Sequence, residues 1–144
     1  MKKNILIIFI SLCLATLAQG KNYEKNLYFE EGKKLFDKKK YIESKLYFEK
    51  DIVFNPKSEN SYLYLAKIFK ESEKDNLEEN NLNTVLLLNP KNEEAIYLLA
   101  LLNIKKSNFS KANELISTMT IVCKKMCSKK KELKEKLDRS QKSK

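Results

Sequence analysis

Two stretches that begin with the same dipeptide decide the fold of this chain: Asn55-Pro-Lys-Ser-Glu-Asn-Ser-Tyr-Leu-Tyr-Leu-Ala66 and Asn89-Pro-Lys-Asn-Glu-Glu-Ala-Ile-Tyr-Leu-Leu-Ala100. The two dipeptides lie 34 residues apart. Proline disfavours helix in the residue before it, so each Asn-Pro predicts the end of a helix. Three further sets of positions keep the same spacing: Tyr28, Tyr62 and Ile96; Phe48, Leu82 and Ile116; Gly32, Ala66 and Ala100.

This period resembles that of the tetratricopeptide repeat, a helical hairpin of 34 residues with fixed large, small and proline slots. The resemblance implies an all-α solenoid of three hairpins within 21–126, at 25–58, 59–92 and 93–126. Some residues depart from the pattern. They are Glu31 in a leucine slot, Asp51 and Glu78 in small-residue slots, Asn103 in an aromatic slot, and Asp75 where the other copies have Tyr41 and Phe109.

The pattern predicts seven helices, and the scarcity of glycine and proline (two of each in the chain) agrees with helices joined by short turns. One hairpin cannot bury its apolar face alone, so stacked neighbours supply the core. We expect helices at 24–38, 42–54, 60–73, 77–88, 93–105, 109–122 and 128–139. The last lies in the basic segment 127–144, and Leu133 and Leu137 predict that it caps the third repeat.

Residues 1–20 are predicted to be a secretory signal peptide, cleaved after Ala18 or Gly20. Lys2 and Lys3 precede an apolar run from Ile5 to Ala15, which is shorter than the roughly 20 residues of a membrane-spanning helix. The alternative is an N-terminal anchor that is retained. The signal predicts an exported protein, most simply in the periplasm of a bacterial envelope.

The formal net charge of +10 is concentrated at the C-terminus. Loss of Lys2 and Lys3 leaves +8, of which +7 lies in residues 124–144 and +1 in residues 21–123. The basic tail is a candidate for peripheral contact with an anionic membrane surface, whereas a solvated cap is the simpler interpretation. No aromatic residues interleave the basic run for base stacking, and the signal points to export, so we expect no nucleic-acid partner.

Cys123 and Cys127 are the two cysteines of the predicted mature chain, and a disulfide between them is the default in an exported protein. An unbroken helix holds i and i+4 cysteines in poor geometry for a bridge, so a bridge predicts a helix break around Lys124–Met126. Two alternatives remain: a Cu(I) site that includes Met119 and Met126, and thiol–disulfide exchange.

The absence of histidine and of glycine-rich loops removes most hydrolase, zinc and nucleotide-binding arrangements, so we expect neither catalysis nor a cofactor. In the family that this chain resembles, the first helix of each hairpin lines a groove that binds peptides or partner proteins. The resemblance places these residues on the groove: Asn26, Phe29, Lys33, Phe36, Asn60, Leu63, Lys67, Lys70, Tyr97, Leu101 and Ile104. Packing within the solenoid is the other interpretation for the apolar ones.

The sequence therefore predicts a non-catalytic exported adaptor that binds a protein or peptide. The rival hypothesis is a redox or Cu(I)-handling protein built around Cys123 and Cys127.

Overall fold

A computed structural model describes residues 27–142, in which all regular secondary structure is helical. The predicted signal peptide and Asn26 lie outside these residues. The chain divides into two compact units between Pro56 and Lys57. We call 27–56 the first unit and 57–142 the second unit and describe each by itself.

The first unit is one helical hairpin, made of a helix at 27–37 and α2 (Tyr41–Phe54). Gly32, in the first helix, lies against the Phe48 ring of α2. A Cβ atom added there would lie 2.9 Å from Cε1 of Phe48, closer than carbon atoms normally pack. The Ser44 hydroxyl donates a 2.8 Å hydrogen bond to the Gly32 carbonyl. A small residue in this repeat slot is therefore required by the packing of the Phe48 ring.

Replacing Gly32 by alanine should destabilise the first unit by about 1–2 kcal/mol, because the buried Phe48 ring must shift. Alanine favours helix over glycine by about 1 kcal/mol, and this gain offsets part of the larger steric cost of placing a Cβ against the Phe48 ring. Urea unfolding measures the change. A matched Lys33→Ala variant replaces an exposed neighbour and should stay within about 0.5 kcal/mol of the wild type. An unchanged or raised stability for Gly32→Ala would contradict the packing.

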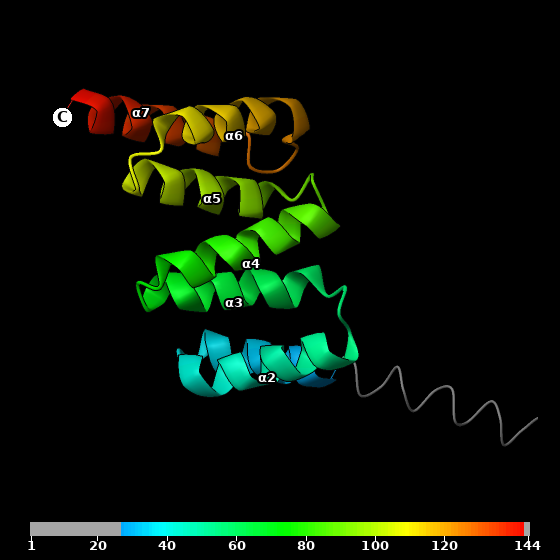
Figure 1. Ribbon diagram of the computed structural model, residues 1–144. Helices are drawn as coiled ribbons and strands as arrows, with labels where there is room; N and C mark the ends of the chain where they lie inside the picture. Colours follow the sequence, from blue (N-terminus) through cyan, green and yellow to red (C-terminus); the bar gives the residue numbers. More distant parts are fainter. Residues whose placement is uncertain (1–26, 143–144) are drawn as a thin grey trace, which may run out of the picture. The chain divides into compact units, whose positions relative to one another are not determined.

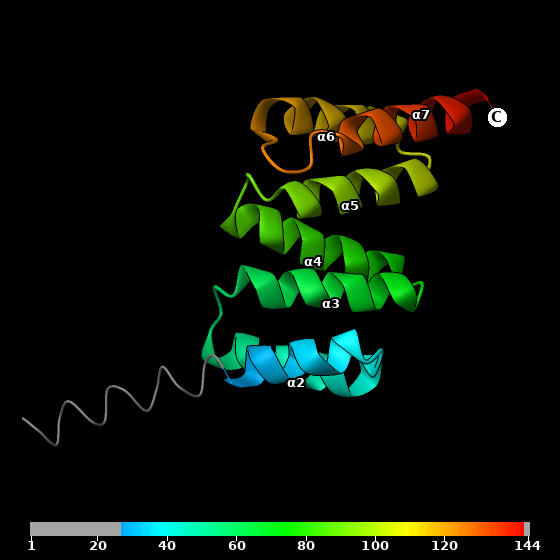
Figure 2. The ribbon, with the colours of Figure 1, turned by 180° about the vertical axis from the view of Figure 1, so that it is seen from behind.

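The second unit is a stack of five helices in chain order (Figures 1 and 2). They are α3 (Glu59–Glu71), α4 (Asp75–Leu88), α5 (Glu93–Lys105), α6 (Phe109–Val122) and α7 (Lys129–Lys142). Each helix packs on the next, and α7 also packs on α5. A continuous apolar core runs through the unit and includes Leu82, Val85, Ile96, Leu99, Ala100, Ile116, Met119 and Leu133.

One turn geometry recurs between the two helices of each hairpin. Lys39, Glu73 and Ser107, which are 34 residues apart, have positive φ angles of 58°, 54° and 61°. The backbone N–H of the next residue donates to a carbonyl five residues earlier: Lys40 to Leu35, Lys74 to Phe69 and Asn108 to Asn103. This is the Schellman pattern, which satisfies carbonyls at a helix end. Helix α3 consequently ends at Glu71, before the expected residue 73.

The helix bounds agree closely with the sequence-based prediction. Helices α5 and α6 have the predicted bounds, and α2 and α4 end just before Asn55-Pro56 and Asn89-Pro90. Helix α4 begins at Asp75 and not at the expected residue 77, because the Lys74 carbonyl accepts the N–H groups of Leu77 and Glu78. Asp75 lies in the first helical turn, where the helix dipole favours an acidic side chain.

The chain leaves the helix between α6 and α7, as the cysteine spacing predicts. Helix α6 ends at Val122, and the Sγ atoms of Cys123 and Cys127 are 2.18 Å apart. The Glu93 carboxylate accepts the backbone N–H of Lys125 at 3.0 Å and that of Met126 at 2.7 Å. These backbone hydrogen bonds, led by that of Met126, lower the pKa of Glu93. The start of α5 thus holds the connecting loop.

Helix α7 is anchored by two leucines and one carboxylate. Leu133 and Leu137 are buried in the core, and the Tyr97 hydroxyl of α5 donates a 2.8 Å hydrogen bond to Glu132. Hydrogen bonds from Lys129, Tyr97 and Lys136 lower the pKa of Glu132 to about 2. The basic segment therefore begins as a packed helix, which extends three residues past the expected end at 139.

Candidate functional site

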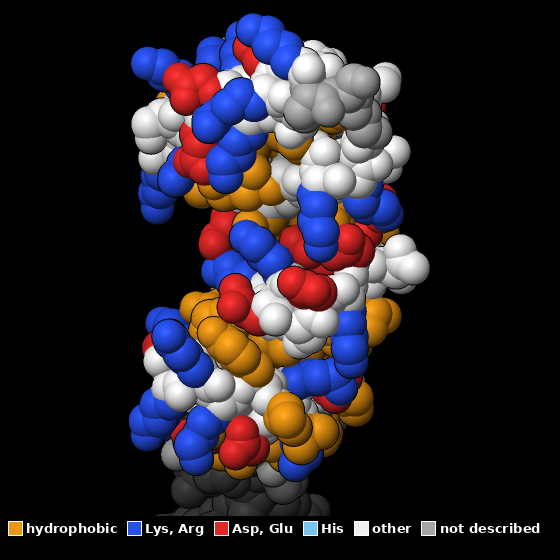
Figure 3. Space-filling view, turned by 90° about the vertical axis from the view of Figure 1, so that its left-hand side faces the viewer, with side chains coloured by type: hydrophobic (Ala, Val, Ile, Leu, Met, Phe, Trp, Pro, Cys, Tyr) orange, Lys and Arg blue, Asp and Glu red, His pale blue; other side chains and the backbone are white. Residues whose placement is uncertain are grey.

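The second unit has a pocket of about 310 Å³ that combines lysines, glutamates and two leucines. The pocket lies near the ends of α3 and α5 and at the start of α4. Figure 3 views the molecule from this side, and apolar side chains in the upper part of the picture lie between basic and acidic ones. The lining residues come from four helices and one turn: Lys70, Glu73, Glu78, Leu101, Leu102, Lys105 and Lys136.

Glu78 is the unusual member of the pocket. Its side chain extends from α4, and the residue is only 4% exposed. Within residues 27–142, no group donates a hydrogen bond to its carboxylate or forms an ion pair with it. Burial raises the pKa of Glu78 to about 7, with Asp75 adding to the rise, while Lys70 and Lys105 oppose it. This carboxyl group therefore changes charge near neutral pH.

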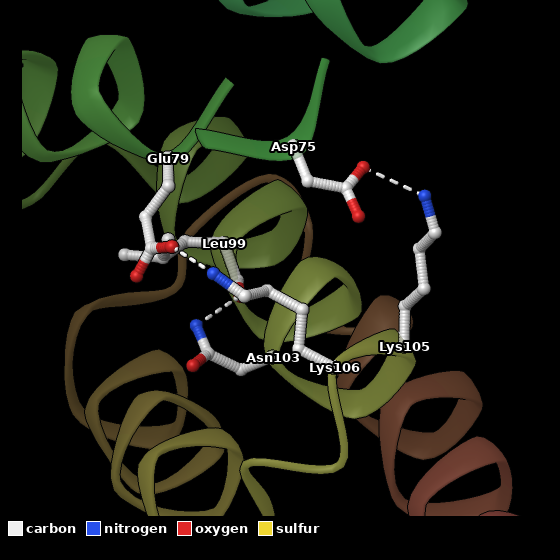
Figure 4. Close-up of polar contacts among 6 residues, drawn as sticks. All are labelled: Asp75, Glu79, Leu99, Asn103, Lys105 and Lys106. Atoms are coloured by element: carbon white, nitrogen blue, oxygen red, sulfur yellow. Dashed lines mark hydrogen bonds and ion pairs between the residues drawn. The ribbon is translucent and has the colours of Figure 1, made fainter. Parts of the chain in front are cut away.

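Ion pairs between α4 and α5 fix the helix ends beside the pocket (Figure 4). Lys105 Nζ lies 2.7 Å from Asp75, and Lys106 Nζ lies 2.5 Å from Glu79. On the α7 side, Lys136 Nζ lies 3.2 Å from Glu132. Lys70 forms no ion pair within the described part of the chain. Among the lining lysines, Lys70 therefore has the charge that is most available to a bound group.

Asn103 belongs to the same end of α5 and explains one departure from the repeat pattern. Asn103 is buried, and its side-chain amide nitrogen donates a 2.8 Å hydrogen bond to the backbone carbonyl of Leu99, one turn earlier (Figure 4). The side-chain amide of this residue, which occupies a slot that the repeat pattern gives to an aromatic, therefore finds a hydrogen-bond acceptor within its own helix. Asn103 does not line the pocket.

The structure brings two of the groove residues expected in the second unit into this pocket, Lys70 and Leu101. Leu63 and Ile104 are buried in the core, and Asn60 is exposed at the start of α3. These three positions do not line the pocket.

Lys67 and Tyr97 are engaged in contacts within the unit. Lys67 Nζ lies 2.7 Å from Glu94 and 4.6 Å from the centre of the Tyr64 ring. Tyr97 is held by Glu132, and burial followed by this hydrogen bond raises its pKa. Both side chains tie helices together in this structure.

The groove residues expected in the first unit pack mainly within its hairpin. The ring of Phe29 lies 5.8 Å from that of Phe48, and the ring of Phe36 lies 5.3 Å from that of Tyr41. Lys33 is exposed. A groove that runs through all three repeats stays a prediction.

Sequence reasoning missed five lining residues: Glu73, Glu78, Leu102, Lys105 and Lys136. Glu78 did carry a signal, since it occupies a slot that the repeat pattern gives to small residues. Lys136 carried none, because only packing of the cap helix brings it beside α5.

Two kinds of feature are absent from the described part of the chain. Residues 27–142 hold no cluster of three or more His, Cys, Asp or Glu side chains arranged for a metal ion. None of the helices in this range has the length and apolar character needed to cross a membrane.

Several of the solved structures similar to this chain are tetratricopeptide-repeat domains. The tetratricopeptide-repeat domain of Arabidopsis OM64 superimposes with a TM-score of 0.73 at 15% identity, covering 83% of this chain and 98% of that one. The TPR2B domain of yeast Sti1, in a complex with pHsp70, superimposes with a TM-score of 0.72 at 15% identity, covering 84% of this chain and 98% of that one. The Yersinia enterocolitica type III secretion chaperone SycD, in complex with a peptide of the translocator YopD, superimposes with a TM-score of 0.72 at 10% identity. The match covers 82% of this chain and 92% of that one.

No family model matches the sequence, and no curated protein matches it. The likeness is therefore one of fold, and it agrees with the 34-residue period of the sequence. The chain has the all-α helical-hairpin fold of tetratricopeptide-repeat domains.

Proposed function

We propose that this protein is a non-catalytic adaptor that binds a partner protein, and that the pocket around Lys70 and Leu101 is part of its binding surface. One observation carries the proposal: a lysine that has no ion pair within residues 27–142 lies beside two leucines in a hollow between helices. Such a combination of apolar wall and charged group suits the capture of a peptide segment. Two similar structures, SycD with a peptide of YopD and the Sti1 domain in a complex with pHsp70, support a role in protein interaction.

Site-specific photo-crosslinking tests the location of this surface. A photoreactive residue at position 70 should capture a discrete partner, whereas the same residue at position 91 should not. Lys91 is an exposed residue before α5, at the opposite end of that helix from Lys105. Equal capture at the two positions would show that the pocket is not the binding surface.

The Lys70→Glu variant should bind the captured partner about tenfold more weakly, since it replaces the most available positive charge of the pocket by a negative one. Titration of the purified partner measures the change, with Lys91→Glu as the charge-matched control. Lys70 is exposed and at the end of α3, so the variant should keep its helical circular dichroism spectrum. Unchanged affinity would rule out Lys70 as a binding residue.

We further propose that the adaptor is exported and that Cys123 and Cys127 form a structural disulfide. Protein purified without reductant should show no thiol that reacts with iodoacetamide until it is reduced. The Cys123→Ser, Cys127→Ser variant should lose roughly 2 kcal/mol of stability at most, since the closed loop is short, and should keep its partner. Loss of function without loss of folding would favour the redox hypothesis.

A further inference from the structure

Helix α2 of the first unit exposes a stripe of apolar side chains. Ile42, Leu46 and Val53 are 81%, 53% and 73% exposed. Their spacing of i, i+4 and i+11 places them within about 40° of one another around a helix of 3.6 residues per turn. Most of the large apolar side chains that are exposed within residues 27–142 belong to the first unit, although it is the shorter of the two. We call these three residues the α2 stripe.

The repeat fold does not require apolar residues at the first two positions of the α2 stripe. The residues that correspond to Ile42 and Leu46 in the later repeats are polar and exposed: Asn76 and Asn80 in α4, Ser110 and Glu114 in α6. Packing of the hairpin therefore does not explain Ile42 and Leu46. A contiguous apolar surface that folding does not need is typical of a contact surface.

Lysines surround the α2 stripe. Lys38, Lys39 and Lys40 directly precede α2, and the helical spacing places Lys45 and Lys50 on the two sides of the stripe. Among residues 27–142, Lys38 and Lys39 have no ion pair. Lys50 has none either, and its Nζ lies 5.5 Å from the centre of the Tyr47 ring. Three positive charges beside the stripe are therefore available to a bound surface.

The acidic residues near the stripe do not cancel this charge. Glu43 lies 3.9 Å from Nζ of Lys40, and Glu49, which lies within the stripe, is 2.7 Å from Nζ of Lys45. Asp37 is the remaining acid of this segment. Residues 37–50 thus have five lysines against three acids, a net charge of +2. Two copies of the stripe placed face to face would repel each other, whereas an anionic surface would be attracted.

Helix α7 does not offer the same combination, although it is richer in lysine. Its leucines, Leu133 and Leu137, are 0% and 3% exposed because they belong to the core of the second unit. The cap helix therefore presents charge without an apolar face. Binding of a helix at a lipid surface draws on both apolar burial and attraction to anionic headgroups. Only the surface around α2 combines the two within the described range.

We propose that the first unit docks on the surface of an anionic membrane through the α2 stripe. Ile42, Leu46 and Val53 enter the boundary between headgroups and acyl chains, and Lys38, Lys39 and Lys50 face the lipid phosphates. The inference goes beyond the proposed function, because it concerns a surface of the other unit and a partner of another chemical class. It gives the adaptor a place at a membrane while the pocket beside Lys70 binds a protein.

Co-sedimentation with lipid vesicles tests the proposal. The protein is the predicted mature chain, residues 21–144, which contains every described helix and lacks the apolar run of the signal. Vesicles of equal parts phosphatidylglycerol and phosphatidylcholine should bind it at least about tenfold more tightly than vesicles of phosphatidylcholine alone. Added salt should weaken binding to the anionic vesicles. Equal binding to the two compositions, or no binding to either, would overturn the proposal.

The second repeat supplies the variant that removes the apolar half of the surface. Ile42→Asn combined with Leu46→Asn copies the asparagines of α4, so the variant should keep its helical circular dichroism spectrum. It should bind the anionic vesicles at least about tenfold more weakly, since two apolar side chains no longer leave water. Leu87→Asn is the matched control, because Leu87 is 83% exposed on α4. The control should bind as the wild type does, and an equal loss in both variants would contradict the assignment to α2.

Charge reversal tests the other half of the surface. Lys38→Glu combined with Lys39→Glu should weaken binding to anionic vesicles at least about tenfold, at roughly 1 kcal/mol per lysine near the lipid. Lys131→Glu combined with Lys134→Glu changes the net charge equally on exposed residues of α7, and it should weaken binding less than about threefold. A larger loss with the α7 pair would assign the membrane contact to the tail and overturn the proposal.

Light scattering distinguishes the membrane from a second copy of the chain. The protein should be monomeric without vesicles. A dimer that the Ile42→Asn, Leu46→Asn variant converts to a monomer would show that another copy covers the stripe, and the proposal would be wrong. Failure here is separate from failure of the proposed function, since crosslinking at position 70 reports on the pocket whether or not the first unit binds lipid.

Discussion

Replacing Glu78 by glutamine should raise the stability of the protein at pH 8 and leave it nearly unchanged at pH 4. Glu78 is buried, and its pKa rises from 4.5 to about 7 on folding. At about 1.4 kcal/mol per unit, the ionised carboxylate destabilises the folded state by up to about 3 kcal/mol. Glutamine has a similar shape and never ionises, so it removes this cost.

The direction of the pH effect follows from the raised pKa. The unfolded chain ionises Glu78 near pH 4.5, whereas the folded chain retains the proton until about pH 7. The contribution of Glu78 to stability is therefore fully present below pH 4.5, and it is lost as the pH rises towards 7. Above pH 7 both states are ionised, and the full difference between wild type and Glu78→Gln is reached.

Urea unfolding of both proteins between pH 4 and pH 8 measures the effect. Glu79→Gln is the matched control, because Glu79 is half-buried and paired with Lys106. The control should change stability by less than about 1 kcal/mol at either pH. A constant difference between wild type and Glu78→Gln across this range would show that Glu78 titrates normally in the folded protein.

Truncating a buried leucine of the cap helix α7 should change the free energy of unfolding by as much as ionisation of Glu78 does. Leu133 is 0% exposed and belongs to the apolar core of the second unit. Leu133→Ala should lower the free energy of unfolding by about 2–4 kcal/mol, from lost burial and the cavity left behind. The basic segment would then be an integral part of the fold, although its composition resembles that of a solvated tail.

Chemical denaturation checks this prediction, with Lys134→Ala as the control. Lys134 is the adjacent residue on α7 and is exposed, so its removal should change stability by less than about 0.5 kcal/mol. If Leu133→Ala were as mild as Lys134→Ala, the cap would not contribute to the core in solution.

The local pattern of the chain was enough to predict its helices. The start of α5 follows from Asn89-Pro90 and from Asn92, whose side chain accepts the N–H of Ala95, and the bounds of α6 follow from the apolar spacing of the repeat. The helix break at Cys123 follows from the geometry of closely spaced cysteines. The errors lie at helix ends such as Glu71 and Asp75, where a Schellman turn with a non-glycine residue leaves no mark in the composition.

The lining of the pocket was predicted only in part, because a repeat pattern says which helix faces inward but not what its side chains contact. Lys67 and Lys70 looked equivalent in the sequence. In the structure Lys67 pairs with Glu94 of the next repeat, while Lys70 lies beside the pocket with no ion pair among residues 27–142. The difference arises from residues about 30 positions away, which no local pattern relates to either lysine.

What the sequence determined by itself is the period, the all-α class, the number and approximate bounds of the helices, and the position of the basic segment. These properties depend on neighbours within one repeat. Only the tertiary structure decided that Glu78 lies buried without a hydrogen-bond partner in the described range, that Lys70 is the most available charge beside it, and that α7 supplies Lys136 to the same pocket. Burial and charge depend on which helices stack, so they belong to the packed unit and not to any single stretch of the chain.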